Sequence, residues 1–196
     1  MMSISKSRIL WLVCLCVVLA LAACGPTTPT AVPPSAEDHF VQGNEYSQLG
    51  DFEKAVGEYT KVLELEPGDV DAMSNLGVAY YNLGQLDEAI EQYSRALELA
   101  PEDADIHSNL AAAYVQKYQE SGAQDQLDSA LEEYTAAVDL EPNLAEAHFG
   151  LGVVYGLLER NDEAIRELTR FQELDTGKDP IATENAAAYL EQLRGQ

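Results

Sequence analysis

The chain has 196 residues, of which 34 are Asp or Glu and only 11 are Lys or Arg, so its formal net charge is −23. Hydrophobic residues make up 46% of it, which excludes global disorder and suffices for one or two packed domains. A surface this acidic offers no cations to nucleic-acid phosphates, so we expect no nucleic-acid partner. The cysteines, Cys14, Cys16 and Cys24, all precede residue 25, which excludes a disulfide framework, a thiolate metal site and a cysteine nucleophile from the rest.

The first 23 residues are typical of an export signal. Lys6 and Arg8 precede an uncharged apolar run at residues 9–23. This run is shorter than the roughly 20 apolar residues that a helix needs to cross a bilayer, so a transmembrane anchor is the weaker interpretation. The run ends in Leu-Ala-Ala-Cys at residues 21–24, which resembles the lipobox of bacterial lipoproteins.

This resemblance implies removal of residues 1–23 as a signal peptide and attachment of a diacylglycerol to Cys24, with a further acyl chain such as palmitate on the new amino terminus. Several acyl chains anchor a protein stably where one is marginal. The alternative is an ordinary signal peptide with a chance cysteine. Gly25 stands where an Asp retains Gram-negative lipoproteins in the inner membrane. The expected location is therefore the outer membrane in a Gram-negative cell, and otherwise the outer face of the cytoplasmic membrane.

Residues 24–35 are predicted to be a tether that follows the lipidated cysteine. Residues 25–35 contain four of the eight prolines and no charged residue, which favours an extended linker over a packed element. At about 3.1 Å per residue in polyproline II form, it would hold the next domain roughly 30 Å from the membrane. An O-glycosylated stalk is the alternative.

From residue 36 onward the sequence repeats with a period of 34 residues, interrupted once by a step of 41. Apolar residues within the unit keep helical spacing, and Gly50 and Gly84 mark turns between paired helices. The period is carried by three series: Tyr46, Tyr80, Tyr114 and Tyr155; Ala55, Ala89, Ala130 and Ala164; Pro67, Pro101 and Pro142.

The second unit contains Leu76-Gly77-x-x-Tyr80, followed by Ala89, Tyr93 and Pro101. This pattern resembles the tetratricopeptide repeat, a helix-turn-helix unit of about 34 residues. The resemblance implies an all-α, right-handed solenoid of about four repeats, with units at residues 36–69, 70–103, 104–144 and 145–179 and a C-terminal capping helix at 180–196. Unit one has Gln42 where leucine is usual, and unit four has no closing proline.

Small residues recur at fixed spacing on the two helices of a unit. Gly43, Gly77 and Gly152 each precede an alanine by 12 residues. We expect each glycine to face that alanine across a tight antiparallel crossing. Since one pair cannot bury its apolar face alone, neighbouring pairs stack into a solenoid with a concave surface.

In tetratricopeptide proteins the first helix of each pair lines the concave groove, and the resemblance implies a protein or peptide partner there. The predicted groove residues are Glu37, Phe40, Val41, Asn44, Asp71, Ser74, Asn75, Val78, Asn82, Asp105, Ser108, Asn109, Gln116, Glu146, Phe149 and Val153.

Acids recur in register along this groove, at Glu37, Asp71, Asp105 and Glu146. One hypothesis is an acidic ladder that favours a cationic or neutral peptide. The alternative is that these acids complement the helix dipoles, and both can hold. Relatives that clamp the carboxylate end of chaperone tails have cations where this chain has Asp105 and Asn109, so we do not expect that ligand.

The third unit is longer by seven residues, which lie within residues 115–127. Seven residues make two helical turns, so both helices can extend and keep their phase. One hypothesis is a projecting hairpin that carries Tyr118 and forms a second contact surface. The alternative is a tolerated insertion.

Three histidines, His39, His107 and His148, share one repeat position, where the second unit has Met73. Adjacent repeats stack about 10 Å apart, too far for a shared metal ion, so the pattern predicts interhelix packing. The Asp-x-Asp pairs at 69–71 and 103–105 lack the glycine and glutamate of a calcium loop, which favours helix capping.

No nucleophile with a base, metal set or tuned carboxylate pair is recognisable, so we expect neither enzymatic activity nor a cofactor. The sequence predicts a membrane-anchored protein-binding scaffold. In layout it is similar to tetratricopeptide lipoproteins that act as pilus-secretin assembly factors, barrel-assembly accessory subunits or adaptors for cell-wall enzymes. One alternative is a structural subunit of an envelope complex that uses the convex face or the repeat-three hairpin, and another is a small-ligand carrier.

Overall fold

The computed structural model describes residues 33–175 and 180–195. The chain divides into two units, residues 1–33 and 34–196, so the predicted signal peptide, Cys24 and most of the tether lie outside the described residues. No helix in the described ranges has the length and apolar character needed to cross a bilayer. The described helices are α2 Ala36–Gln48, α3 Phe52–Leu65, α4 Val70–Asn82, α5 Leu86–Leu99, α6 Ala104–Ser121, α7 Gln124–Leu140, α8 Ala145–Leu157, α9 Asn161–Leu174 and α10 Pro180–Arg194.

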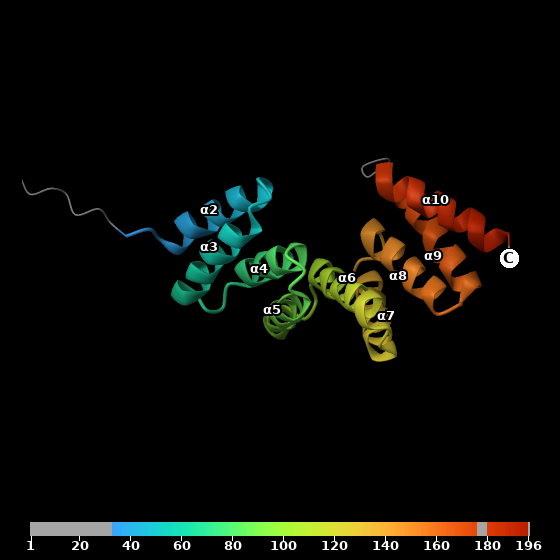
Figure 1. The fold of residues 1–196 in the computed structure, drawn as a ribbon, viewed down its shortest axis with the longest axis horizontal. Coiled ribbons are helices and arrows are strands. Elements are labelled where there is room, and N and C mark those ends of the chain that lie inside the picture. The colour runs from blue at the N-terminus through green and yellow to red at the C-terminus, as the bar shows by residue number, and fades with distance from the viewer. Residues whose placement is uncertain (1–32, 176–179, 196) are drawn as a thin grey trace, which may run out of the picture. The chain divides into compact units, whose positions relative to one another are not determined.

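The helices pack in chain order as four antiparallel pairs followed by α10 (Figure 1). The pairs are α2 with α3, α4 with α5, α6 with α7, and α8 with α9, and each second helix also packs on the next first helix. Among the first helices, α6 also contacts both α4 and α8. The predicted all-α solenoid of four repeats is therefore confirmed.

Several helices begin with a side chain that satisfies a free backbone N–H. Ser35 and Asp38 form a reciprocal capping box at the start of α2. The Asp69 carboxylate accepts from the Ala72 N–H at 2.9 Å, and Asp103 serves α6 in the same way. The interpretation of the Asp-x-Asp pairs as helix caps is thus confirmed for Asp69 and Asp103.

The turns between paired helices require left-handed backbone. Gly50, Gly84 and Gly122 have φ of 75°, 72° and 68°, which glycine adopts without a side-chain clash. In repeat four the same position is Glu159, with φ of 58°. Repeat four therefore carries a strained residue where the other repeats have glycine.

The recurring spacing of glycine and ring residues sets the distance between paired helices. A Cβ built on Gly43 would lie 2.6 Å from Cε1 of Tyr59, and one built on Gly77 would lie 2.6 Å from Cε1 of Tyr93. The glycines therefore face bulky side chains 16 residues later, which corrects the expectation that they face alanines 12 residues later. The ring needs the space that the missing side chain leaves.

The first repeat has a polar outer face. Asp38, Gln42 and Glu45 occupy the positions at which the later first helices bury Ala72, Leu76 and Ala79; Ile106, Leu110 and Ala113; and Ala147, Leu151 and Val154. Gln42 donates to Glu45 at 2.9 Å. The unusual Gln42 thus belongs to a polar face of α2, at a position where the later first helices bury a leucine.

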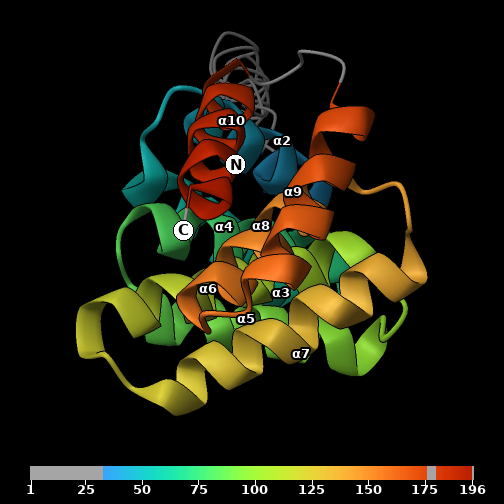
Figure 2. The same cartoon turned by 90° about the vertical axis from the view of Figure 1, so that its right-hand side faces the viewer.

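The opposite end is covered by α10, as predicted, and Figure 2 shows this helix beside α9. Its buried residues Ala186, Leu190 and Leu193 have the spacing of Ala147, Leu151 and Val154, so α10 packs like the first helix of a further repeat. Ile181, at the start of α10, is 73% exposed and does not belong to this buried face.

The seven extra residues lengthen both helices of repeat three. Helix α6 has 18 residues and α7 has 17, against 13 and 14 in the other repeats. The extension predicted for both helices is confirmed, and Leu127 stays buried because the phase is kept. Tyr118 packs against the core cluster of repeat three, so it does not project as a contact residue.

Candidate functional site

The acidic groove residues lie apart from one another on the surface. Glu37, Asp71, Asp105 and Glu146 are exposed, each in the first turn of a different first helix. This placement complements the helix dipoles and also leaves the carboxylates free to meet cations. In residues 33–175 and 180–195, no three His, Cys, Asp or Glu side chains are grouped closely enough to hold a metal ion.

Three of the predicted groove amides are engaged within the array. The Tyr59 hydroxyl donates to Asn44 Oδ1 at 2.7 Å, and Asn75 Nδ2 donates to the same oxygen at 3.5 Å. Asn82 Nδ2 donates to the carbonyl of Val78 in its own helix at 2.8 Å. The structure therefore gives these three predicted groove residues hydrogen bonds within the array.

Other predicted residues of the first helices are only partly accessible. Phe40 packs against Tyr59 with ring centroids 6.0 Å apart. Ser74, Ser108 and Asn109 are half-buried.

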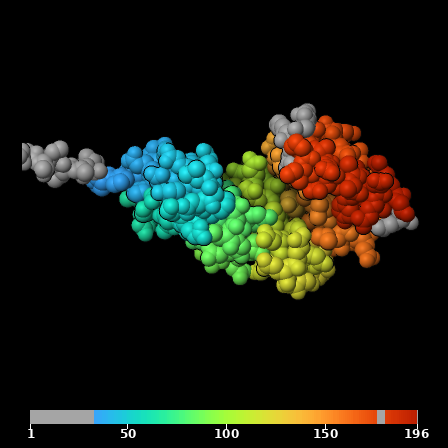
Figure 3. Space-filling view, turned by 45° about the horizontal axis from the view of Figure 1, so that its top comes forward, coloured from blue at the N-terminus to red at the C-terminus, as the bar shows by residue number. Residues whose placement is uncertain are grey.

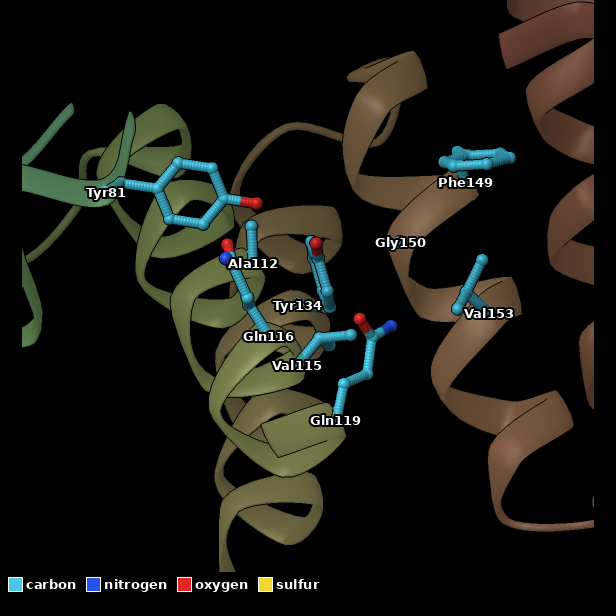
Figure 4. A pocket seen from close by; sticks show the side chains of 9 residues that line it. All are labelled: Tyr81, Ala112, Val115, Gln116, Gln119, Tyr134, Phe149, Gly150 and Val153. Carbon is cyan, nitrogen blue, oxygen red and sulfur yellow. The ribbon is translucent and has the colours of Figure 1, made fainter. Parts of the chain in front are cut away.

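Gln116 and Phe149 both line a cavity of about 310 Å³ between repeats three and four (Figure 4). In Figure 3 the surface is hollowed between the green second repeat and the red α10, and yellow-green α6 lies in the hollow. Helices α4, α6, α7 and α8 contribute the lining residues Tyr81, Ala112, Val115, Gln116, Gln119, Tyr134, Phe149, Gly150 and Val153.

This cavity is uncharged, although the chain is strongly acidic. None of its nine lining residues is Asp, Glu, Lys, Arg or His. Phe149 and Val153 supply apolar surface, while Gln116 and Gln119 supply amides that both donate and accept hydrogen bonds. Such a mixture of apolar surface and a few polar groups is typical of ligand-binding pockets.

Tyr134 reaches the cavity from α7, and only 6% of it is exposed. Figure 4 shows its side chain and that of Gln119 in the space between α6 and α8, with Gly150 opposite on α8. A Cβ on Gly150 would lie 2.1 Å from Cζ of Tyr134, so this glycine makes room for the ring. Burial, with a smaller contribution from Tyr81, raises the pKa of Tyr134. The hydroxyl therefore keeps its proton and can donate.

A second cavity of about 360 Å³ lies beside the first, between the start of α8, the end of α9 and α10. Glu146 and Phe149, both predicted groove residues, line it. Phe149 packs on Phe171 with ring centroids 5.2 Å apart, so Phe149 separates the two cavities.

In repeats one, three and four, a histidine holds the first helix to the second helix. Nδ1 of His39, His107 and His148 lies 2.6, 2.6 and 2.7 Å from a carboxylate of Glu58, Glu133 and Glu167, respectively. Burial raises the pKa of Glu58, but hydrogen bonds from Lys61 and His39 outweigh burial and lower it overall. Packing between helices is confirmed as the role of the histidines.

Repeat two lacks this pair and changes both positions. Met73 replaces the histidine, and the buried Gln92 replaces the glutamate. The Gln92 amide accepts from Arg95 at 2.9 Å. A carboxylate at this site would have no histidine partner, so an uncharged amide suits the position.

Family models for the tetratricopeptide repeat match residues 40–104, 84–133 and 123–159. The chain is built of tetratricopeptide repeats. No curated protein matches it in sequence. Among solved structures it is similar to TTC0263, a thermophilic TPR protein of Thermus thermophilus, with 23% identity, 81% of each chain covered and a TM-score of 0.69.

Two further similar structures are tetratricopeptide proteins described with a peptide-binding site or a bound peptide. The chain is similar to YrrB, described as a TPR protein with an unusual peptide-binding site, at 26% identity over 80% of this chain and 78% of that one, with a TM-score of 0.60. It also resembles the first TPR of Spaghetti (RPAP3) bound to the HSP90 peptide SRMEEVD, at 21% identity over 64% and 90% of the chains, with a TM-score of 0.55. The latter likeness concerns the fold alone.

Sequence reasoning missed most of the cavity of this tetratricopeptide array. It named Gln116, Phe149 and Val153 but omitted the lining residues Tyr81, Ala112, Val115, Gln119, Tyr134 and Gly150. Tyr134 continues the spacing of Tyr59 and Tyr93 on the second helices, which by itself gives no indication of a cavity. A position-by-position comparison of the repeats points to these residues, because repeats three and four differ from repeat one at several of the cavity-lining positions.

Proposed function

We propose that the chain is a membrane-anchored adaptor that holds a protein partner by a peptide segment bound in the groove of its tetratricopeptide array. The observation that carries this proposal is the uncharged cavity between the first helices α6 and α8, lined by Gln116 and Phe149. Tetratricopeptide folds commonly mediate protein–protein interaction, and the similarity to YrrB, with its peptide-binding site, supports the same use of the groove here. The proposal includes no catalytic step.

The anchoring part of the proposal rests on the sequence around Cys24. We expect lipid attachment at Cys24 and a location in the cell envelope, where the adaptor would take part in assembly of envelope structures. Labelling with an alkyne palmitate tests this, since Cys24→Ala should abolish the label and release the protein from the membrane fraction. Retention of both label and membrane association by the variant would exclude Cys24 as the anchor.

Site-specific photocrosslinking in intact envelopes tests the groove. A benzophenone side chain placed at Gln116 or Gln119 reports on the cavity, while the same group at Glu132 or Thr135 reports on the exposed face of α7 as a matched control. We expect a specific protein adduct from the two groove positions and none from the two α7 positions.

The other outcomes decide between the remaining functions. Adducts from the α7 positions alone would indicate a structural subunit that contacts its complex through the second helices. An absence of protein adducts from all four positions would contradict the adaptor function and favour a carrier of small ligands.

A further inference from the structure

We propose that the cavity between repeats three and four binds an internal, uncharged segment of the partner, with one aromatic or branched apolar side chain against Phe149 and Val153. In this arrangement the Tyr134 hydroxyl and the amides of Gln116 and Gln119 hydrogen-bond to the adjoining peptide groups. This inference rests on the proposed function and specifies the ligand of the same groove.

The first argument is the Tyr134 hydroxyl. Although the residue is only 6% exposed, the hydroxyl makes no hydrogen bond within the part of the chain that the structure describes. The equivalent Tyr59 of repeat one donates to Asn44 at 2.7 Å and lies 3.3 Å from the Ser47 hydroxyl. Tyr93 of repeat two also lacks a partner among the described residues, but it does not line the cavity.

The missing partners of Tyr134 result from specific residues. Repeat three has Ala112 and Val115 at the positions where repeat one has Asn44 and Ser47. Both replacements line the cavity. The hydroxyl is not enclosed by the described residues and faces the cavity, where it is available to a bound group.

The second argument is the position of Gln119 in the helical extension of repeat three. First helices in the other repeats end at the position equivalent to Gln116, whereas α6 continues to Ser121. Gln119 belongs to this added turn and lies one turn beyond Gln116 on the same face. The extension of repeat three therefore completes the wall of the cavity, in a role different from a projecting hairpin.

The third argument is charge. No cation lines the cavity, so a carboxylate terminus or an acidic side chain would be desolvated there without a counterion, and the chain as a whole would repel it. This excludes a carboxylate clamp at this position. Two amides and a hydroxyl match the peptide groups of an extended segment, because a helical segment already pairs its own N–H and C=O groups.

The fourth argument is size. A volume of about 310 Å³ is at the lower end of the range of roughly 300–1,000 Å³ for small-molecule sites. Such a cavity suits one large side chain with its neighbouring peptide groups. The ligand is thus a short stretch of polypeptide that continues along the groove in both directions.

A series of synthetic peptides tests the ligand chemistry directly. Fluorescein-labelled nonapeptides of Ser, Thr and Gly, with both termini blocked, carry Phe, Leu, Gly, Asp or Lys at the centre. A second set ends in a free carboxylate directly after the Phe. Binding to the full chain in detergent micelles is followed by fluorescence anisotropy. We expect the Phe and Leu peptides to bind at least tenfold more tightly than the Gly and Asp peptides, and the free carboxylate to weaken binding.

Variants of the chain locate the site. Tyr134→Phe removes only the hydroxyl and should weaken the Phe peptide about three- to tenfold, the effect of one hydrogen bond. Tyr59→Phe makes the same change where the hydroxyl is bonded internally, and should leave peptide affinity within about twofold. Gln119→Ala alters an exposed residue that does not support the core, and should also weaken binding.

Equal affinity for all central residues, or a Tyr134→Phe variant that binds as tightly as the parent chain, would overturn the inference. If no peptide binds while groove crosslinks to a protein persist, this inference fails and the adaptor function stands. Loss of both peptide binding and groove crosslinks would remove the proposed function as well.

Discussion

Replacing Gly77 by alanine tests whether a missing side chain sets the spacing between paired helices. The new Cβ would lie 2.6 Å from Cε1 and 2.8 Å from Cδ1 of Tyr93, well inside van der Waals contact. Tyr93 is only 2% exposed and has no free space to enter. Overpacking of this kind costs about 1–3 kcal/mol, while removing a glycine from a helix gains about 1 kcal/mol. We therefore expect a net destabilisation of up to about 2 kcal/mol.

Gly57→Ala is the matched control, because Gly57 is helical and exposed and a Cβ there would meet nothing within 4 Å. This variant should gain about 1 kcal/mol from helix propensity alone. Since the propensity gain is common to both variants, the difference between their free energies of unfolding isolates the packing cost, about 1–3 kcal/mol. Urea unfolding followed by circular dichroism, at equal m-values, measures it. Equal stabilities for the two variants would refute the argument that Tyr93 requires a glycine.

Three further predictions concern stability. The double variant His148→Met/Glu167→Gln recreates the Met73–Gln92 combination of repeat two. Its loss in unfolding free energy should be smaller than the sum of the two single losses, each about 1–3 kcal/mol. Additive losses in a double-mutant cycle would contradict the pairing of His148 with Glu167. Glu159→Gly should raise stability by about 0.5–1 kcal/mol, measured by urea unfolding, because the residue has φ of 58°. The backbone hydrogen bond from Ser35 is the main cause of a lowered pKa at Asp38. The Asp38 carboxylate therefore stabilises the fold above pH 3.8, and this stabilisation is lost as the pH falls through the lowered pKa. The difference in urea midpoint between the parent chain and Asp38→Asn should therefore shrink from pH 7 to below pH 3, and a constant difference would contradict the capping box.

The repeat register predicted the fold well because it is read from many positions at once. Helix pairs, turn glycines, aspartate caps and the seven-residue step all follow from spacing. The register was wrong about which residue of the second helix contacts the glycine of the first helix. It paired Gly43 with Ala55, whereas the structure places the ring of Tyr59 against the glycine, because a bulky ring fills the space that two small residues would leave empty.

The candidate site was less accessible to sequence reasoning for a physical reason. The register treats repeats as equivalent, and it assigns groove contacts to first helices and core contacts to second helices. The cavity depends instead on differences between repeats, and its floor includes Tyr134, a second-helix residue. A hydroxyl that loses its partners cannot be recognised until the neighbouring side chains are placed around it.

The differences between repeats act together on this one side chain. Repeat three has Ala111 where repeats one and two have the glycine that accommodates the ring. Gly150, which replaces an asparagine of the two preceding repeats, provides the lost space on the following helix. Ala112 and Val115 then remove the hydrogen-bond partners that its equivalent has in repeat one. These changes leave a well-packed ring whose hydroxyl faces an open cavity and has no partner in the described residues, an arrangement that fits the proposed ligand.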